Sequence, residues 1–205
     1  MMAVAGARSQ HWEAVMSRAG SIDHWHILIS GFRQDLSNAT GFDKLLLRML
    51  DANVSGFISD HQWSDDWGGV AEAIKRRSTD LPTIKVYAYS WGAGWGFVQL
   101  AKHLRRRGFR VAHAVLADPV YRSRLLPTWL PLNPLSMLST PTINVPGNVN
   151  EVSWFYQRID RPAGHRPVAK QPSTKINEGV ELVRAHAFMD DAPEFHSKAL
   201  EVASC

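Results

Sequence analysis

The sequence predicts a three-layer α/β fold, in which a mostly parallel central sheet carries helices on both of its faces. Two observations lead to this prediction. Short apolar runs alternate along the chain with stretches whose apolar residues recur at helical spacing. The apolar runs are nearly continuous instead of alternating with polar residues, which is typical of parallel strands buried on both faces.

Local patterns place the elements in the first half of the chain. An amphipathic segment at 12–19 comes first. We then expect a strand at 24–30 that stops at Gly31, a helix near 42–50, a strand near 54–59, a helix near 67–77, a strand from about residue 84, and a helix that ends near residue 107. Basic residues in the last turn of that helix suit its dipole, and Gly108 ends it.

The second half of the chain is interrupted by proline. An apolar run at 111–117 predicts a strand that ends at an Asp-Pro pair. Residues 119–141 are rich in Pro and Leu, so a long regular element is unfavourable there and we expect a flap. The remaining expected elements are a last strand within 150–158, a proline-broken loop at 161–173, and a helix through residue 202 that opens with Asp191 as N-cap and Pro193 in its first turn.

Length and composition indicate one domain over residues 1–205. A chain of 205 residues, 45% of them hydrophobic, forms one sizeable core and is short for two. Its 23 Lys and Arg stand against 19 Asp and Glu, a mixed surface that does not indicate a nucleic-acid partner. The sequence shows neither a membrane span nor the apolar core of a secretion signal, so we expect a cytoplasmic protein without stable membrane insertion. The oligomeric state stays open.

Cysteine and histidine usage gives no sign of a metal site. The only cysteine is Cys205, which excludes an internal disulfide and a thiolate cluster. The nine histidines are scattered without a convincing ligand pair beside carboxylates. We therefore expect neither a metal nor another cofactor.

One stretch carries a catalytic motif. Residues 88–92, Ala-Tyr-Ser-Trp-Gly, depart by one residue from the G-x-S-x-G nucleophile elbow, a sharp strand-to-helix turn that exposes its serine above a sheet. Ser90 is the candidate nucleophile. One alternative is an ordinary strand-to-helix connection. The other is a phosphate-binding loop built on Gly92, Gly94 and Gly96, but the lysine that a P-loop requires does not follow.

Motifs elsewhere in the chain resemble the α/β-hydrolase superfamily, in particular its small lipase-like and esterase-like serine hydrolases. The segment LADPV at 116–120 is similar to the segment that carries their acid, and HAFMD at 186–190 is similar to their terminal histidine segment. The family order Ser, Asp, His is reproduced by Ser90, Asp118 and His186. The resemblance implies that His186 is the general base and that Asp118 fixes its tautomer.

Rival residues exist for two of these roles. Asp160 follows the next strand and is the alternative acid, while His165 and His196 are the alternative bases. We favour His186 because it precedes the last expected helix in a loop, where a base can reach over the sheet edge.

The resemblance also implies an oxyanion hole of two backbone N–H groups. One belongs to Trp91, which follows the serine. The other belongs to the loop after the first strand, where Phe32 is favoured and Arg33 stays an alternative.

The function expected from these residues is hydrolysis of a carboxylic ester or thioester through an acyl-enzyme, with a small-molecule substrate. An acyltransferase or amidase would use the same triad, and a non-catalytic binding module is the alternative from another class. Trp129 and Leu130 in the flap are candidates for lining an acyl pocket, with packing against the core as the other interpretation.

Overall fold

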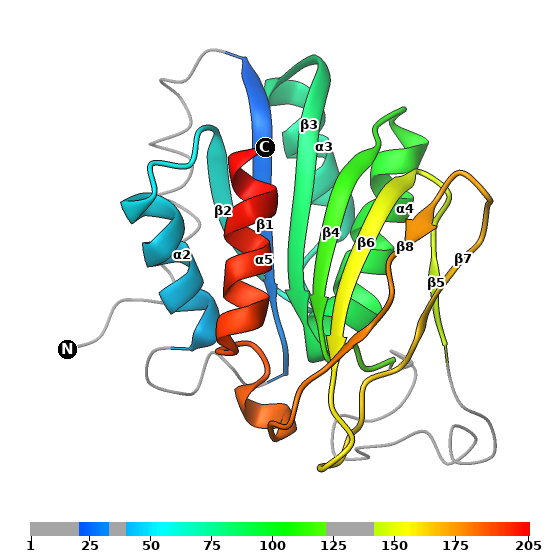
Figure 1. The fold of residues 1–205 in the computed structure, drawn as a ribbon. Coiled ribbons are helices and arrows are strands. Elements are labelled where there is room, and N and C mark those ends of the chain that lie inside the picture. The colour runs from blue at the N-terminus through cyan, green and yellow to red at the C-terminus, as the bar shows by residue number, and fades with distance from the viewer. Residues whose placement is uncertain (1–20, 33–39, 122–141) are drawn as a thin grey trace.

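The computed structural model describes residues 21–32, 40–121 and 142–205. Its central sheet has the strand order β2-β1-β3-β4-β6-β8, with β9 paired to β6 beside β8. All described pairings in this sheet are parallel. This confirms the predicted fold class (Figure 1).

The elements have the following bounds. The strands of the central sheet are β1 (Ile22–Ser30), β2 (Phe57–Gln62), β3 (Ser78–Tyr89), β4 (Val111–Ala117), β6 (Val149–Tyr156), β8 (Lys175–Ile176) and β9 (Val180–Glu181). A separate parallel pair consists of β5 (Ile143–Val145) and β7 (Pro167–Ala169). The helices are α2 (Gly41–Asp51), α3 (Trp67–Arg77), the π-helix η2 (Gly92–Gly96), α4 (Phe97–Arg106), the 3-10 helix η4 (His186–Phe188) and α5 (Pro193–Ser204).

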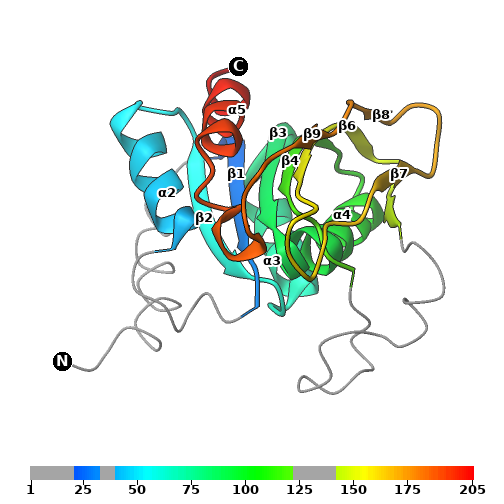
Figure 2. The ribbon, with the colours of Figure 1, turned by 60° about the horizontal axis from the view of Figure 1, so that its bottom comes forward.

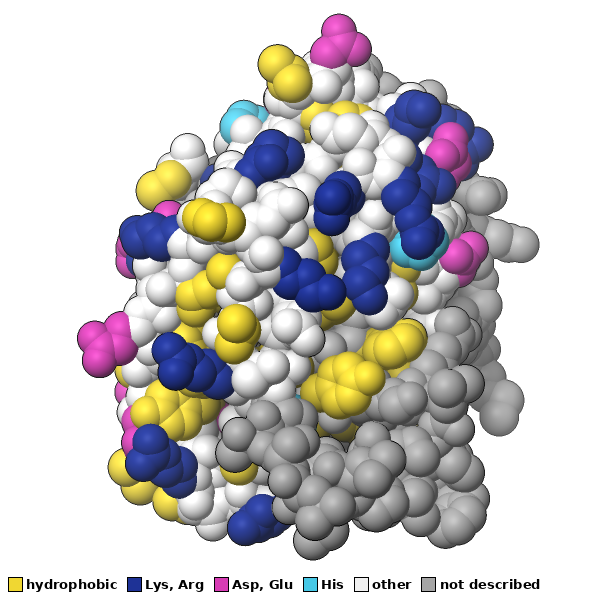
Figure 3. Space-filling model, turned by 90° about the vertical axis from the view of Figure 1, so that its right-hand side faces the viewer, with side chains coloured by type: hydrophobic (Ala, Val, Ile, Leu, Met, Phe, Trp, Pro, Cys, Tyr) yellow, Lys and Arg dark blue, Asp and Glu magenta, His cyan; other side chains and the backbone are white. Residues whose placement is uncertain are grey.

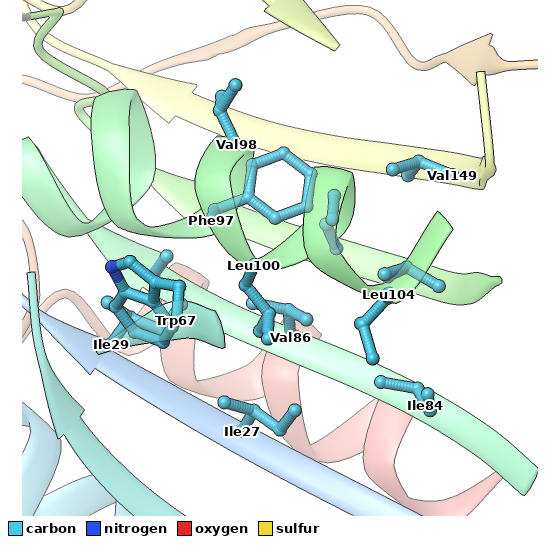
Figure 4. Packing of buried hydrophobic residues seen from close by; sticks show 14 of the residues in the cluster. Ile27, Ile29, Trp67, Ile84, Val86, Phe97, Val98, Leu100, Leu104 and Val149 are labelled. Carbon is cyan, nitrogen blue, oxygen red and sulfur yellow. The ribbon is translucent and has the colours of Figure 1, made fainter. Parts of the chain in front are cut away.

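Helices cover both faces of the sheet. Figures 1 and 2 show α2 and α5 on one face and α3 and α4 on the other. In β1, Ile27 and Ile29 pack toward α3 and α4, whereas Leu28 packs toward α2 and α5. Both faces of the strand are therefore apolar, which explains its continuous apolar run. Figure 4 shows the α4 side of this core, where Leu100 faces Ile27 and Val86.

Most predicted elements of the described residues are confirmed. The helix at 67–77 and the strand at 111–117 have the expected bounds, and β1 and α2 contain the expected segments. The strand expected near 54–59 begins later, as β2, because the chain leaves α2 through Asn53 and Gly56, whose φ angles of 50° and 113° are incompatible with an extended strand. The segment at 12–19 lies outside the described residues.

Three predictions in the second half were wrong. Residues 161–173 are not all loop, since β7 lies within them and pairs with β5. The strand β6 is not the last, because β8 and β9 follow it. Asp191 does not cap α5, whose N-cap is Ala192 with no side-chain hydrogen bond. The Asp191 carboxylate instead accepts a hydrogen bond from Lys44 of α2.

The described helices include none long and apolar enough to cross a membrane. The prediction of a single domain stays a prediction, since the described residues leave three ranges out.

Candidate active site

The candidate nucleophile sits in a sharp turn directly after β3. Ser90 has a φ of 52°, a left-handed conformation that costs energy for a residue with a Cβ atom. The turn is tight enough that a Cβ atom added to Gly92 would clash with the backbone of Ile29 in β1. Ser90 is 4% exposed. The predicted elbow geometry is therefore present even though Ala88 stands at its first small position.

The candidate acid occupies the equivalent place on the neighbouring strand. Tyr89 of β3 pairs with Ala117 of β4, so Ser90 and Asp118 each follow directly after a paired residue. Because the carboxyl ends of parallel strands meet at one edge of a sheet, the two side chains emerge together. Asp118 has no exposed surface, and its φ of 40° is also in the left-handed region. A hydrogen bond from the Val120 backbone to the Ser90 carbonyl ties the two turns together.

His186 opens η4 and bridges these two residues. Its Nε2 lies 2.9 Å from Ser90 Oγ, and its Nδ1 lies 2.6 Å from Asp118 Oδ2. A carboxylate only accepts hydrogen bonds, so Nδ1 carries the proton and Nε2 is left to accept from the serine hydroxyl. Ser90, His186 and Asp118 are called the edge cluster below. Two of them, Ser90 and Asp118, follow the carboxyl ends of β3 and β4, which point to the bottom of Figure 1.

Tyr89 contacts both the backbone and the ring of His186. Its hydroxyl donates to the His186 backbone carbonyl at 2.7 Å, and the two rings lie 5.1 Å apart between centroids. Burial raises the pKa of the Tyr89 phenol far above its ordinary value, an effect to which Asp190 and Asp118 add. The Tyr89 hydroxyl therefore stays protonated at neutral pH and can donate this hydrogen bond. The sequence analysis did not single out this residue.

The rival acid and bases lie elsewhere. Asp160 is exposed, and its carboxylate accepts from the backbone of Arg161. His165 Nδ1 accepts from the Tyr121 backbone at 2.8 Å, and burial lowers the pKa of its imidazole. His196 is buried inside α5, where its Nε2 donates to the Asp190 carbonyl at 2.7 Å. Of the residues considered for these roles, the structure brings Asp118 and His186 to Ser90.

Aromatic side chains gather around Trp91, the residue that follows the candidate nucleophile. The ring of Phe32 stacks on that of Trp91, with centroids 4.2 Å apart, and the edge of Trp63 meets Trp91 at 5.0 Å. A Cβ atom on Gly31 would stand 2.9 Å from that of Ser90, so the loop after β1 passes beside the nucleophile. This is the place expected for the second oxyanion donor. The roles of the Phe32 and Trp91 N–H groups stay predictions, and Arg33 lies outside the described residues.

A hollow of about 210 Å³ lies between η2, α4 and β5. Trp95, Lys102 and Lys170 are among the residues that line it, as are Tyr121 and Thr142, which flank the undescribed part of the expected flap. Figure 3 shows lysine and arginine side chains gathered on this side of the molecule. Burial, and next the charge of Lys170, lower the pKa of Lys102. Trp129 and Leu130 lie outside the described residues, so their role stays a prediction.

A second group of serine, histidine and carboxylate lies within the sheet. His113 of β4 has its Nε2 3.0 Å from Ser153 Oγ and its Nδ1 4.0 Å from Glu151 Oε2, both on β6. The Glu151 carboxylate instead accepts from Lys175 and Asn177. Ser153, His113 and Glu151 are called the strand cluster below. Among the described residues, no group of three or more His, Cys, Asp or Glu is placed to hold a metal ion.

Comparison with known proteins assigns the chain to no family. The sequence matches no family model, and it matches no curated protein. Three solved chains match in structure, and one of them is titled "RedJ with PEG molecule bound in the active site". That match has 11% sequence identity and a TM-score of 0.44, and it covers 88% of this chain and 92% of the other. The parallel sheet with helices on both faces is compatible with the α/β-hydrolase superfamily.

Proposed function

We propose that this protein is a serine hydrolase that cleaves a carboxylic ester or thioester through an acyl-enzyme. The observation that supports this proposal is the unbroken chain of contacts from Ser90 Oγ through the imidazole of His186 to Asp118 Oδ2. A serine hydroxyl is a weak nucleophile at neutral pH and needs a base within hydrogen-bond reach. His186 meets this requirement at 2.9 Å.

The reaction has two halves. Ser90 Oγ attacks the acyl carbonyl carbon while His186 Nε2 takes the hydroxyl proton. The tetrahedral intermediate collapses, the bond to the leaving group breaks, and the imidazolium returns the proton to the departing alcohol or thiol. Water then attacks the acyl-enzyme with His186 again as base, which releases the acid and restores Ser90. Asp118 keeps the proton on Nδ1 and stabilises the imidazolium in both halves.

Backbone N–H groups of Trp91 and Phe32 are proposed to bind the oxyanion. Trp91 directly follows the nucleophile and begins the η2–α4 helix, whose N-terminal end favours negative charge. Phe32 lies in the loop that passes beside Ser90, and its ring packs on Trp91. The stacked rings fix the two backbone segments relative to each other.

Covalent labelling with a fluorophosphonate tests the nucleophile, because only an activated serine hydroxyl attacks this reagent rapidly. We expect the label on Ser90 by peptide mapping and no label in Ser90→Ala. The matched control is Ser153→Ala, since Ser153 also has its hydroxyl next to a histidine nitrogen. This variant should label as the wild type does. Label that persists in Ser90→Ala, or none in the wild type, would refute the assignment and favour a binding module.

The flap is proposed to line the acyl pocket through Trp129 and Leu130. If it does, alanine at both positions weakens turnover of medium-chain esters more than that of acetate esters, because each buried methylene contributes roughly 0.8 kcal/mol. A panel of p-nitrophenyl esters measures this preference. An unchanged preference with a lower melting temperature would instead show that these side chains pack against the core. Leu81→Ala is the control, since Leu81 is 92% exposed at the beginning of β3.

A further inference from the structure

Gln157 directly follows β6 at the edge of the sheet that holds the edge cluster. Phe155, two residues before Gln157, pairs with Ala117 of β4, and its carbonyl accepts from the Asp118 backbone at 2.8 Å. Gln157 therefore reaches the edge next to the acid. It is 1% exposed, although its primary amide is strongly polar. A buried amide needs hydrogen-bond partners, and the identity of these partners indicates its role.

Gln157 contacts both oxygens of the Asp118 carboxylate. Its side-chain Nε2 lies 3.1 Å from Oδ2, and its backbone N–H lies 3.3 Å from Oδ1. The orientation of the amide is fixed, because Oε1 accepts from the Asp160 backbone at 2.7 Å. With the amide turned over, Oε1 would face the carboxylate and this bond would be lost. The donor side of the amide therefore faces Asp118.

The same amide also organises the loop that covers the acid. Nε2 lies 3.1 Å from the carbonyl oxygens of both Asp160 and Pro162. The loop then passes so close to the acid that a Cβ atom on Gly164 would clash with Asp118 Oδ1. Asp118, which has no exposed surface, is covered by this loop, and the neutral N–H donors of Gln157 stabilise its charge.

We propose that Gln157 is a positioning residue that orients the Asp118 carboxylate toward His186. A carboxylate rotates about its Cβ–Cγ bond, and Oδ2 must stay aligned with Nδ1 of the imidazole for the tautomer to be kept. A neutral donor on the same oxygen restricts this rotation without adding a charge that would oppose the imidazolium. This inference rests on the proposed function for its effect on turnover, but the arrangement itself is independent of the substrate.

Two variants of Gln157 test the inference. Gln157→Leu has a similar size and no donor, and Gln157→Met keeps the length of the side chain and also lacks the donor. Two readouts are needed. One is kcat and KM for an activated ester; the other is the low-field NMR signal of the His186 Nδ1 proton in the resting protein, assigned by its loss in His186→Ala. We expect both variants to lower kcat about tenfold to hundredfold, the scale of one hydrogen bond to a charged group. KM should stay within about twofold, and the proton signal should move upfield.

Asn148→Leu is the matched control. Asn148 also has a buried side-chain amide, and it lies directly before β6. This amide donates to the carbonyls of Ala101 and Phe109 near the other end of β4. This variant should lose stability without changing kcat or the proton signal. The inference would be overturned if the Gln157 variants kept the wild-type kcat and the wild-type Nδ1 proton signal. It would also be overturned if Asn148→Leu changed kcat and the proton signal as much as the Gln157 variants do. Gln157→Met alone decides if Gln157→Leu does not fold. A wild type without esterase activity would refute the proposed function, and the proton signal would still decide the role of Gln157.

Discussion

The edge cluster and the strand cluster contain the same kinds of side chain but differ in their backbone. In the edge cluster, Ser90 and Asp118 sit in left-handed turns beyond the ends of two strands, and their side chains converge on one imidazole. In the strand cluster, all three residues lie inside regular strands, where side chains stand side by side and do not converge. The histidine-to-carboxylate distance is 2.6 Å in the first and 4.0 Å in the second. The same residue types therefore do not converge by composition alone, and in the edge cluster the left-handed turns at the strand ends bring them together.

The largest expected effect comes from removing the two histidines in turn. His186→Ala should lower kcat for an activated ester by roughly four to six orders of magnitude, the scale seen when a triad histidine is removed. His113→Ala should stay within a few-fold of wild type, because Glu151 does not hold its imidazole. His165→Ala and His196→Ala should also retain turnover, with circular dichroism as the check on folding. Equal losses from His113→Ala and His186→Ala would remove the distinction between the clusters.

The next largest effect on kcat should come from the carboxylates, and it should differ between Asp118 of the edge cluster and Glu151 of the strand cluster. Asp118→Asn should lower kcat by about three to four orders of magnitude, because an amide at this position favours the wrong tautomer of the imidazole. Glu151→Gln should have little effect on kcat, since this carboxylate is bound by Lys175 and Asn177. Asp160→Asn tests the rival acid and should also remain active. A larger loss in Asp160→Asn than in Asp118→Asn would move the acid to the later strand.

The smallest expected effect concerns a histidine that has no carboxylate partner. His26 donates through Nε2 to the Ser55 carbonyl and accepts at Nδ1 from Tyr87, and burial lowers its pKa to about 4. The pKa of an unfolded histidine is about 6.5, so the unfolded state binds the proton more tightly. The contribution of His26 to stability is complete above pH 6.5 and is lost as the pH falls toward 4, by up to about 3 kcal/mol.

Urea denaturation at several pH values between 7 and 4 measures this dependence. His26→Leu removes the titrating group, so its stability should fall less steeply over this range than that of the wild type. Its kcat at pH 7 should stay within a few-fold of wild type, which again separates a histidine buried in the sheet from the one at its edge. Parallel stability curves for the two proteins would contradict the assignment to His26.

The sequence was informative where a residue has a motif or a strand end to mark it. Ser90, Asp118 and His186 lie in recognisable segments, and the structure brings them within hydrogen-bond distance of one another. Gln157 has no motif, yet it also follows a strand, so the rule that marked Asp118 could have marked it. The contact of Tyr89 with His186 could not be predicted, because an aromatic residue in a buried strand is ordinarily a core residue.

Other parts of the structure could not be read from the sequence for physical reasons. The strands β8 and β9 have two residues each, too few to show any periodicity. Asp191 matched the pattern of an N-cap, but its carboxylate instead pairs with the ammonium group of Lys44, which lies in the remote helix α2. Local patterns do not contain such competition between distant segments.

The sequence separations within the edge cluster have a consequence for folding. The contact between Ser90 and His186 spans 96 residues, and that between His186 and Asp118 spans 68. Contacts between residues so far apart in the chain form late, because much of the loop-closure entropy is lost before they stabilise anything. The turn at Ser90 can form as soon as β3 docks, whereas the imidazole of His186 arrives only when the segment after β9 closes over the sheet. Under the proposed function, the return of esterase activity during refolding therefore reports the closure of the segment after β9, whereas the return of secondary structure reports the formation of the sheet.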